Sequence, residues 1–175
     1  MSKVAAYLRG HVSGEVSTRD DVRLALATDT GPLFIKPELV VYPRTTNDIR
    51  KVARFAWQLA EKNHTLPVTV RGAGSDSTGA SLGKGVTLVL PAHINNIFEY
   101  DTKQKLVRLQ PGVTVAALQS ALALHGTAVP SLFSSKPYGT VGGAIASATG
   151  GALSGKYGTI AQAIEQLEVV LANGD

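Results

Sequence analysis

Short apolar runs recur along the chain and predict β-strands at five places. A Pro or Gly follows each run within two residues, and the runs are 39–42, 66–70, 86–90, 106–109 and 164–172. Runs of this length with such boundaries are typical of buried strands.

Helical periodicity is found at two places between these runs. Apolar residues recur every three or four positions over 49–60, and Thr45 or Thr46 can cap the helix that contains them. A second amphipathic helix is expected over 115–122, with Thr114 as its N-cap. The predicted order is therefore strand, helix, strand, loop, two strands, helix and a final strand.

Two glycine-rich segments interrupt this pattern. The first glycine segment, residues 71–79, directly follows a predicted strand, and the second, residues 140–151, follows a loop rich in Pro, Ser and Gly. Both combine missing Cβ atoms with hydroxyls and backbone N–H groups, which suits close approach to a phosphate-bearing ligand. The alternatives are an ordinary glycine-rich turn for the first segment and tight packing of small residues for the second.

Neither segment matches a common nucleotide-binding fingerprint in full. The first begins like GxGxxG but has Ser77 at the third glycine, and the glycine-rich residues after it are poor helix formers, so a Rossmann fold is disfavoured. The second runs into GxxxxGK with Tyr157 where a P-loop needs Ser or Thr, which disfavours a nucleoside triphosphatase.

Charge and composition narrow the chemistry further. The net charge of +4 arises from scattered residues, so no nucleic-acid face is expected. The chain has no cysteine, which removes disulfides, thiol nucleophiles and cysteine-bound metals. Its four histidines are widely separated, so no metal site is expected either. No signal peptide or apolar stretch of bilayer length is found, and we expect a cytoplasmic protein without a transmembrane segment.

The order of the motifs resembles that of one flavoprotein family. This is the vanillyl-alcohol oxidase and p-cresol methylhydroxylase (PCMH) family, whose FAD-binding domain the chain resembles, particularly in the D-lactate dehydrogenase and glycolate oxidase branch. The matching segments are the Pro-x-Thr-Thr helix start within 39–48, the loop 71–79, the Pro-Gly-Val turn at 110–114, the loop 140–151, the Tyr-Gly turn at 155–158 and the strand and turn over 167–175.

The resemblance implies an α+β fold of two lobes with FAD between them. Residues 1–36 form an N-terminal lead-in and residues 37–175 the PCMH-type domain. A small βαβ-like lobe is expected over about 37–92, and a second lobe with a mixed sheet over about 93–175. Because a strand and a turn end the sequence, we expect the domain to be incomplete at its C-terminus.

The same resemblance implies the residues that hold FAD. Backbone amides of 72–76 and the Ser77 hydroxyl would bind the pyrophosphate, flanked by Gly79 and Ala80, and Ser135 would lie near the isoalloxazine ring. The full set of expected cofactor-binding residues is Arg71, Gly72, Ala73, Gly74, Ser75, Asp76, Ser77, Gly79, Ala80, Ser135, Thr140, Gly142, Gly143, Ser147, Gly151 and Tyr157.

The chemistry implied is oxidation of a 2-hydroxy acid such as D-lactate or glycolate, with hydride transfer to FAD. Some relatives carry a histidine that tethers the flavin where this chain has Ser75, so the FAD is expected to be non-covalent. No residue here is a good catalytic acid or base. The catalytic groups and the small-molecule substrate site are expected in a C-terminal cap domain, the electron acceptor is open, and the fragment alone is expected to be inactive.

Two other functions stay open on the residues alone. The chain could be a stand-alone nucleotide- or phosphate-binding module without redox activity, or a scaffold in which the glycines serve only packing.

Overall fold

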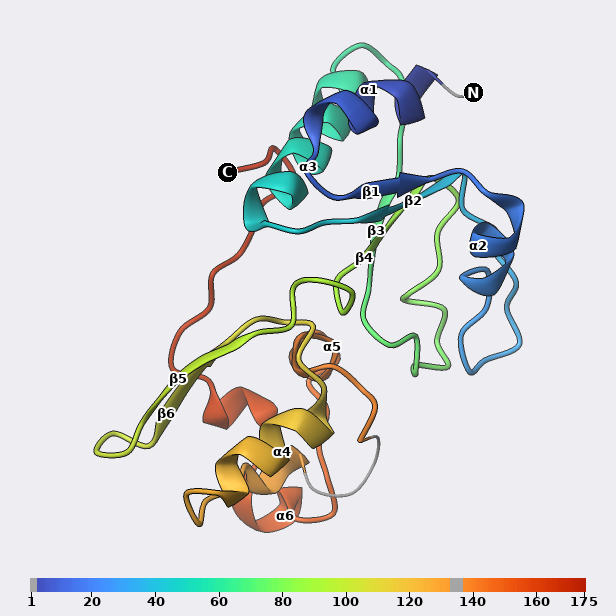
Figure 1. Ribbon diagram of the computed structural model, residues 1–175. Helices are drawn as coiled ribbons and strands as arrows, with labels where there is room; N and C mark the ends of the chain where they lie inside the picture. The colour runs from blue at the N-terminus through green and yellow to red at the C-terminus, as the bar shows by residue number, and fades with distance from the viewer. Residues whose placement is uncertain (1–2, 133–136) are drawn as a thin grey trace.

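The computed structural model describes residues 3–132 and 137–175, which form two lobes, one above the other in Figure 1. The first lobe contains α1 (Lys3–His11), β1 (Glu15–Ser17), α2 (Asp20–Ala25), β2 (Leu39–Tyr42), α3 (Thr46–Ala60), β3 (Val68–Arg71) and β4 (Val86–Val89). The second contains β5 (Ile97–Asp101), β6 (Leu106–Leu109), α4 (Val115–Ala123), the 3-10 helix η1 (Pro130–Leu132), α5 (Val141–Ala146), α6 (Ser154–Tyr157) and the 3-10 helix η2 (Ile160–Ala163).

A four-stranded sheet organises the first lobe in the order β1-β2-β4-β3. The last three strands are parallel, with Leu39 and Val68 both opposite Val86, and β1 is antiparallel to β2. Strands β2 and β4 are almost wholly buried, which accounts for their continuous apolar sequence. Helices α1 and α3 lie together on one face of the sheet (Figure 1).

Asp48 fixes the junction between β2 and α3. Thr45 caps the helix as expected and forms a capping box with Asp48, which is 1% exposed. Burial would raise the pKa of Asp48, but hydrogen bonds from Ser13, Arg44 and Thr45 outweigh burial and lower that pKa below its usual value. The carboxylate thereby ties the chain between α1 and β1 to the start of α3.

The N-terminal residues are part of this lobe rather than a separate lead-in. Ala5 and Leu8 of α1 are fully buried in the same core as Val41, and Val16 pairs with Val41 in the sheet. Strand β1 could not be predicted from the sequence, because its three residues, two of them polar, are too few to show an alternation of apolar and polar positions.

The second lobe is built around an antiparallel pair, β5 and β6, and a core to which α4 contributes one face. The buried residues of this core are Val113, Val115, Leu118, Leu122, Leu132, Val141 and Ile160. Helix α4 starts after Thr114, whose hydroxyl accepts a hydrogen bond from Ala117 N at 3.1 Å, as predicted. Among the described residues the second lobe contains this antiparallel pair and not the expected mixed sheet.

The predicted strand over 164–172 is also wrong for the described structure. This segment forms no ladder there, and Leu167, Val169 and Leu171 are 57%, 63% and 57% exposed. A strand needs a neighbour to accept its backbone hydrogen bonds, and no strand of the described residues lies along it. Instead the segment runs from the second lobe back to α3 (Figure 1), where Arg50 Nε donates to Gly174 O at 2.9 Å.

Candidate functional site

The first glycine segment starts where β3 leaves the sheet. Leu90 N donates to Arg71 O at 3.1 Å, which is the last bond between β4 and this strand end. Gly74 then has φ +67° and Gly79 φ +82°, and no helix forms over 72–85. In the part of the chain that the structure describes, the N–H groups of Gly72, Ala73 and Gly74 donate to no protein acceptor. Three consecutive donors therefore remain available after β3.

The Arg71 side chain packs against the first glycine segment and supports it. Its side chain is buried at 7% exposure, with Nη2 donating to Thr28 O at 2.9 Å and Nη1 to Ser81 Oγ at 3.4 Å. A Cβ atom at Gly74 would overlap the guanidinium. Burial lowers the pKa of Arg71, and the nearby Asp29 carboxylate opposes that shift. Because the side chain is buried and both of its Nη atoms bond the protein, Arg71 acts as a support for the segment.

A loop from the N-terminal region contacts the same segment. Thr30 N donates to Asp76 O at 3.0 Å, and Asp29 Oδ2 accepts from Gly79 N at 2.9 Å. These residues were not predicted from the sequence, because residues 1–36 were expected to form a lead-in outside the FAD-binding domain. The run of Thr, Asp and Gly over 28–31 was the available signal, since it is typical of a structured turn.

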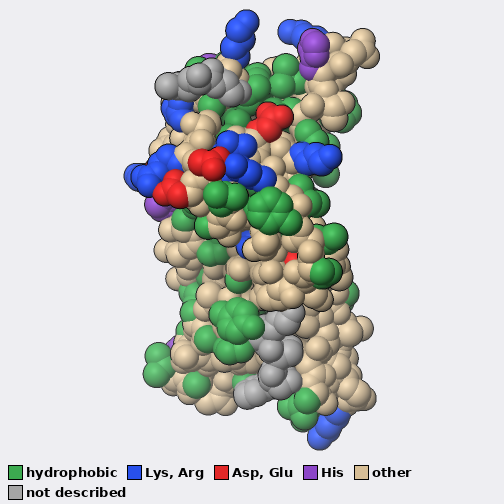
Figure 2. All heavy atoms as spheres, turned by 90° about the vertical axis from the view of Figure 1, so that its right-hand side faces the viewer, with side chains coloured by type: hydrophobic (Ala, Val, Ile, Leu, Met, Phe, Trp, Pro, Cys, Tyr) green, Lys and Arg blue, Asp and Glu red, His purple; other side chains and the backbone are tan. Residues whose placement is uncertain are grey.

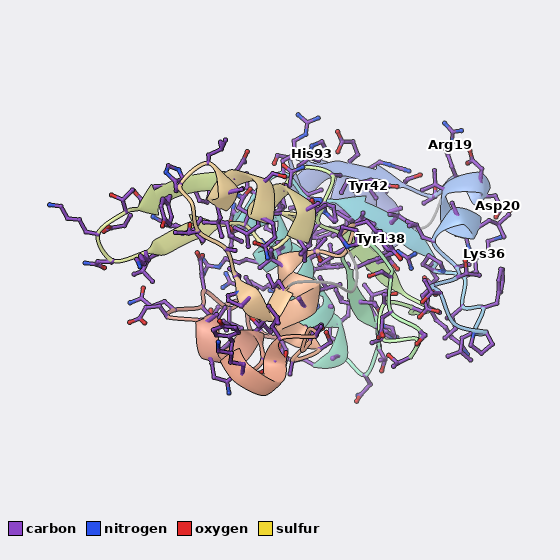
Figure 3. All side chains as sticks on the ribbon, turned by 90° about the horizontal axis from the view of Figure 1, so that it is seen from below. Arg19, Asp20, Lys36, Tyr42, His93 and Tyr138 are labelled. Carbon is purple, nitrogen blue, oxygen red and sulfur yellow. The ribbon has the colours of Figure 1, made fainter. Side chains whose placement is uncertain are left out.

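The loop is itself anchored on α2. Arg23 Nε donates to Pro37 O at 2.7 Å, and Lys36 forms an ion pair with Asp20. Figure 3 shows Arg19, Asp20 and Lys36 close to this short helix. The residues that follow 28–31 in the sequence, Lys36 and Pro37, are thus joined to α2, which precedes that loop.

The second glycine segment forms α5, a short helix that begins after Thr140. Thr140 is 4% exposed, and its hydroxyl accepts from Gly143 N at 3.1 Å. Gly142 lies against Pro111, with only 2.5 Å between a hypothetical Cβ and Pro111 Cβ. Ser147 Oγ donates to Gly143 O at 2.8 Å. The Thr140 and Ser147 hydroxyls, which were expected to contact a ligand, therefore form hydrogen bonds with the backbone of α5.

The two segments meet at one point. A Cβ atom at Gly72 would overlap Thr140 Oγ1, so the first segment touches the start of α5 across the two lobes. Gly151 and Tyr157 lie beyond α5. Gly151 N donates to Ser154 Oγ at 2.6 Å, Tyr157 is 48% exposed, and no hydrogen bond in the described residues joins either to the first segment. Ser135 lies outside the described residues.

The remaining members of the expected set lie on the outer part of the first segment. Ser77 and Ala80 are exposed, with Ser77 N donating to Asp76 Oδ1 at 2.9 Å and Ala80 N to Thr78 Oγ1 at 3.4 Å. Ser75 is half-buried. The N–H of Gly79 is occupied by Asp29, so this residue offers no donor to a ligand.

The face that carries α2 and the loop after β3 has an uneven charge distribution. Figure 2 shows charged side chains gathered on its upper part, whereas uncharged and hydrophobic groups cover most of the middle and lower parts. Residues 140–151 include no charged side chain.

The side chains of His11, His93 and His125 make structural contacts within the protein. His93, labelled in Figure 3, bonds Glu15 at 2.8 Å, and hydrogen bonds from Arg44 and His93 lower the pKa of Glu15 to about 2. His125 stacks with Tyr100. No His, Asp or Glu cluster suited to a metal is found among the described residues, and none of their helices is long and apolar enough to cross a membrane.

Comparison with known proteins gives one matching family and several relatives of similar sequence. The sequence model of the family described as "FAD binding domain" matches residues 37–175. The D-2-hydroxyglutarate dehydrogenase of Pantoea ananatis is 32% identical over 163 residues, covering 93% of this chain and 16% of that protein. The glycolate oxidase subunit GlcD of Bacillus subtilis is 32% identical, covering 87% of this chain and 32% of that protein.

Solved structures share the fold. 6-Hydroxy-D-nicotine oxidase from Arthrobacter nicotinovorans superposes with a TM-score of 0.78 at 27% identity, covering 94% of this chain and 35% of that one. The BBE-like 1 protein of Physcomitrella patens, at 19% identity, has a TM-score of 0.83, covering 98% of this chain and 36% of that one. The expected fold class is confirmed, and the chain spans about a sixth to a third of the length of the relatives it matches.

Proposed function

We propose that this chain, which belongs to the FAD-binding domain family, holds the pyrophosphate of FAD at its first glycine segment, within an oxidoreductase that oxidises a 2-hydroxy acid. Support for the substrate class comes from the names of relatives, which include D-2-hydroxyglutarate dehydrogenase, D-lactate dehydrogenase and a glycolate oxidase subunit. FAD as the cofactor agrees with the family match.

The observation that carries the proposal is the row of unoccupied donors at Gly72, Ala73 and Gly74. Successive backbone N–H groups in a turn form a concave anion site, and a pyrophosphate is the ligand that presents enough acceptors to use them. The buried guanidinium of Arg71 beneath them adds positive charge. The residues present therefore fit the group that the family binds.

The other lobe would complete the site. Because Gly72 touches Thr140, a ligand on the first segment would lie next to the start of α5, where Gly143 is exposed. When bound, FAD supplies the electron-accepting chemistry, and this chain binds and orients it. Substrate and electron acceptor would be recognised by parts of the relatives to which this chain has no counterpart.

Attachment of the flavin is proposed to be non-covalent, since Ser75 stands where some relatives carry the histidine that tethers the flavin. Denaturing the FAD-loaded protein in acid should release all of the flavin into the supernatant. Flavin that stays with the precipitated protein would contradict this.

Titration of the purified chain with FAD tests the proposal. We expect a saturable change in flavin fluorescence and competition by ADP, which shares the pyrophosphate but lacks the flavin. Gly74→Ala should weaken binding, whereas Gly155→Ala, where a Cβ meets nothing within 4 Å, is the matched control and should bind like the native chain. A native chain that binds no FAD would overturn the proposal.

A further inference from the structure

We propose that Asp29 and Thr30 are positioning residues, which hold the first glycine segment so that the N–H groups of Gly72, Ala73 and Gly74 face the ligand. The inference rests on the proposed function, because it concerns the same site. It adds residues from the N-terminal region, outside the part of the chain that the family match covers.

Thr30 holds the carbonyl side of the segment. Its hydroxyl donates to Asp76 O at 2.8 Å and lies 3.2 Å from Ser75 O, while its N–H also donates to Asp76 O. In a trans peptide the C=O and the following N–H point in opposite directions. Holding the Ser75 and Asp76 carbonyls toward Thr30 therefore fixes the two peptide planes that follow Ser75 and Asp76, and with them the course of the chain directly after Gly74.

Asp29 fixes the far end of the segment. One carboxylate oxygen accepts from Gly79 N at 2.9 Å and the other from Gly31 N at 2.7 Å. Gly79 has φ +82°, a conformation that its single N–H contact with Asp29 helps to hold. The Asp29 side chain thus joins the loop 28–31 to the first glycine segment.

The two stretches of chain also fit too closely for an incidental contact. A Cβ atom at Gly31 would overlap Ser77 O, and the Arg71 guanidinium bonds Thr28 O from the other side. Side-chain bonds from Asp29 and Thr30, a backbone bond and a close approach therefore join residues that are about 50 positions apart. Such a support keeps a loop in its binding geometry before the ligand arrives, which lowers the ordering cost on binding.

Variants at Thr30 separate positioning from folding. Thr30→Val removes the hydroxyl and keeps the shape and the N–H, so we expect FAD to bind about fivefold to tenfold more weakly, corresponding to one lost hydrogen bond. Thr30→Ser restores the hydroxyl and should bind within about twofold of the native chain. Thr102→Val, at an exposed threonine in the β5–β6 turn, is the matched control.

Amide hydrogen exchange without FAD gives a second measurement. Asp29→Ala should speed exchange at Gly79 N–H by about tenfold, because its acceptor is lost, and leave exchange in the β5–β6 pair unchanged. Thr30→Val should leave the unfolding midpoint within the range of the Thr102→Val control.

The outcomes are distinguishable. If the native chain binds FAD and Thr30→Val binds it equally well, the positioning role is wrong and the proposed function stands. If Thr30→Ser is as weak as Thr30→Val, the hydroxyl is not the active group and the inference also fails. If the native chain binds no FAD, both proposals are overturned.

Discussion

The two glycine-rich segments have similar compositions but use glycine for different physical reasons. In the first, Gly74 and Gly79 occupy left-handed backbone conformations. In the second, no glycine between 140 and 151 has positive φ, and the left-handed residue is Ala148, at φ +48°. Positive φ requires glycine only in the first segment, whereas close approach requires it in both, at Gly72 against Thr140 and at Gly142 against Pro111.

The means of support differ as well. The first segment has no regular structure and is held by a distant loop through Asp29 and Thr30. The second is held by its own helix and by the turn before α4, where Val113 O accepts from Val141 N and Pro111 O from Gly142 N. Thr140 caps its start, and at its end Ala148 N donates to Ile145 O while Thr149 N donates to Ala144 O, which is the Schellman pattern. The first segment therefore depends on tertiary contacts, whereas the C-terminal end of α5 is satisfied by its own last turn.

Gly74→Ala should have the largest effect on stability. The new Cβ must adopt a left-handed conformation and displace the buried Arg71 guanidinium, so we expect a loss of about 2–4 kcal/mol in the free energy of unfolding. Urea denaturation of the chain without FAD measures it. A loss smaller than that of the Gly155→Ala control would show that the Arg71 side chain moves aside at little cost. Position 74 would then not require glycine, contrary to the contrast drawn between the two segments.

Gly72→Ala should disturb the meeting point of the segments by about 1–3 kcal/mol, because the Cβ overlaps Thr140 Oγ1. A double-mutant cycle with Thr140→Ala, which removes that oxygen, should recover part of the loss. Additive effects in urea denaturation would mean that the two segments do not press on each other.

Ala148→Gly should stabilise the chain by about 0.5–1 kcal/mol, since glycine adopts this left-handed C-terminal position of α5 without strain. A thermal melt would show a raised midpoint. A lowered midpoint would indicate that the entropy cost of glycine outweighs the relieved strain.

Gly143→Ala should change the free energy of unfolding by no more than about 0.5 kcal/mol. The new Cβ would lie 3.0 Å from Thr140 Oγ1, and this small strain is offset by the higher helix propensity of alanine in α5. Comparison with Gly74→Ala under the same conditions then gives the contrast between the segments directly. Equal losses of unfolding free energy for Gly143→Ala and Gly74→Ala would mean that the two segments do not differ in their need for glycine.

Much of the secondary structure followed from local pattern. The strands 39–42 and 106–109 have the predicted bounds, and α3 begins after Thr45 as expected. These elements are encoded by near neighbours, through apolar spacing and capping residues. Strand β1 and the disposition of 164–172 were not predictable in this way, since the first is too short to show a period and the second has strand-like residues without a partner strand.

Local sequence pattern was enough to predict strands β2, β3, β4 and β6, helices α3 and α4, the two glycine segments and, through the resemblance, the FAD-binding family. The roles of the individual glycines and the residues that support them were decided by the tertiary structure. Gly72 touches Thr140, and Asp29 reaches Gly79, only because the folded chain brings distant positions together. Local composition limits which backbone conformations are possible, but contacts between remote segments select which of them is held and which N–H groups stay available to a ligand.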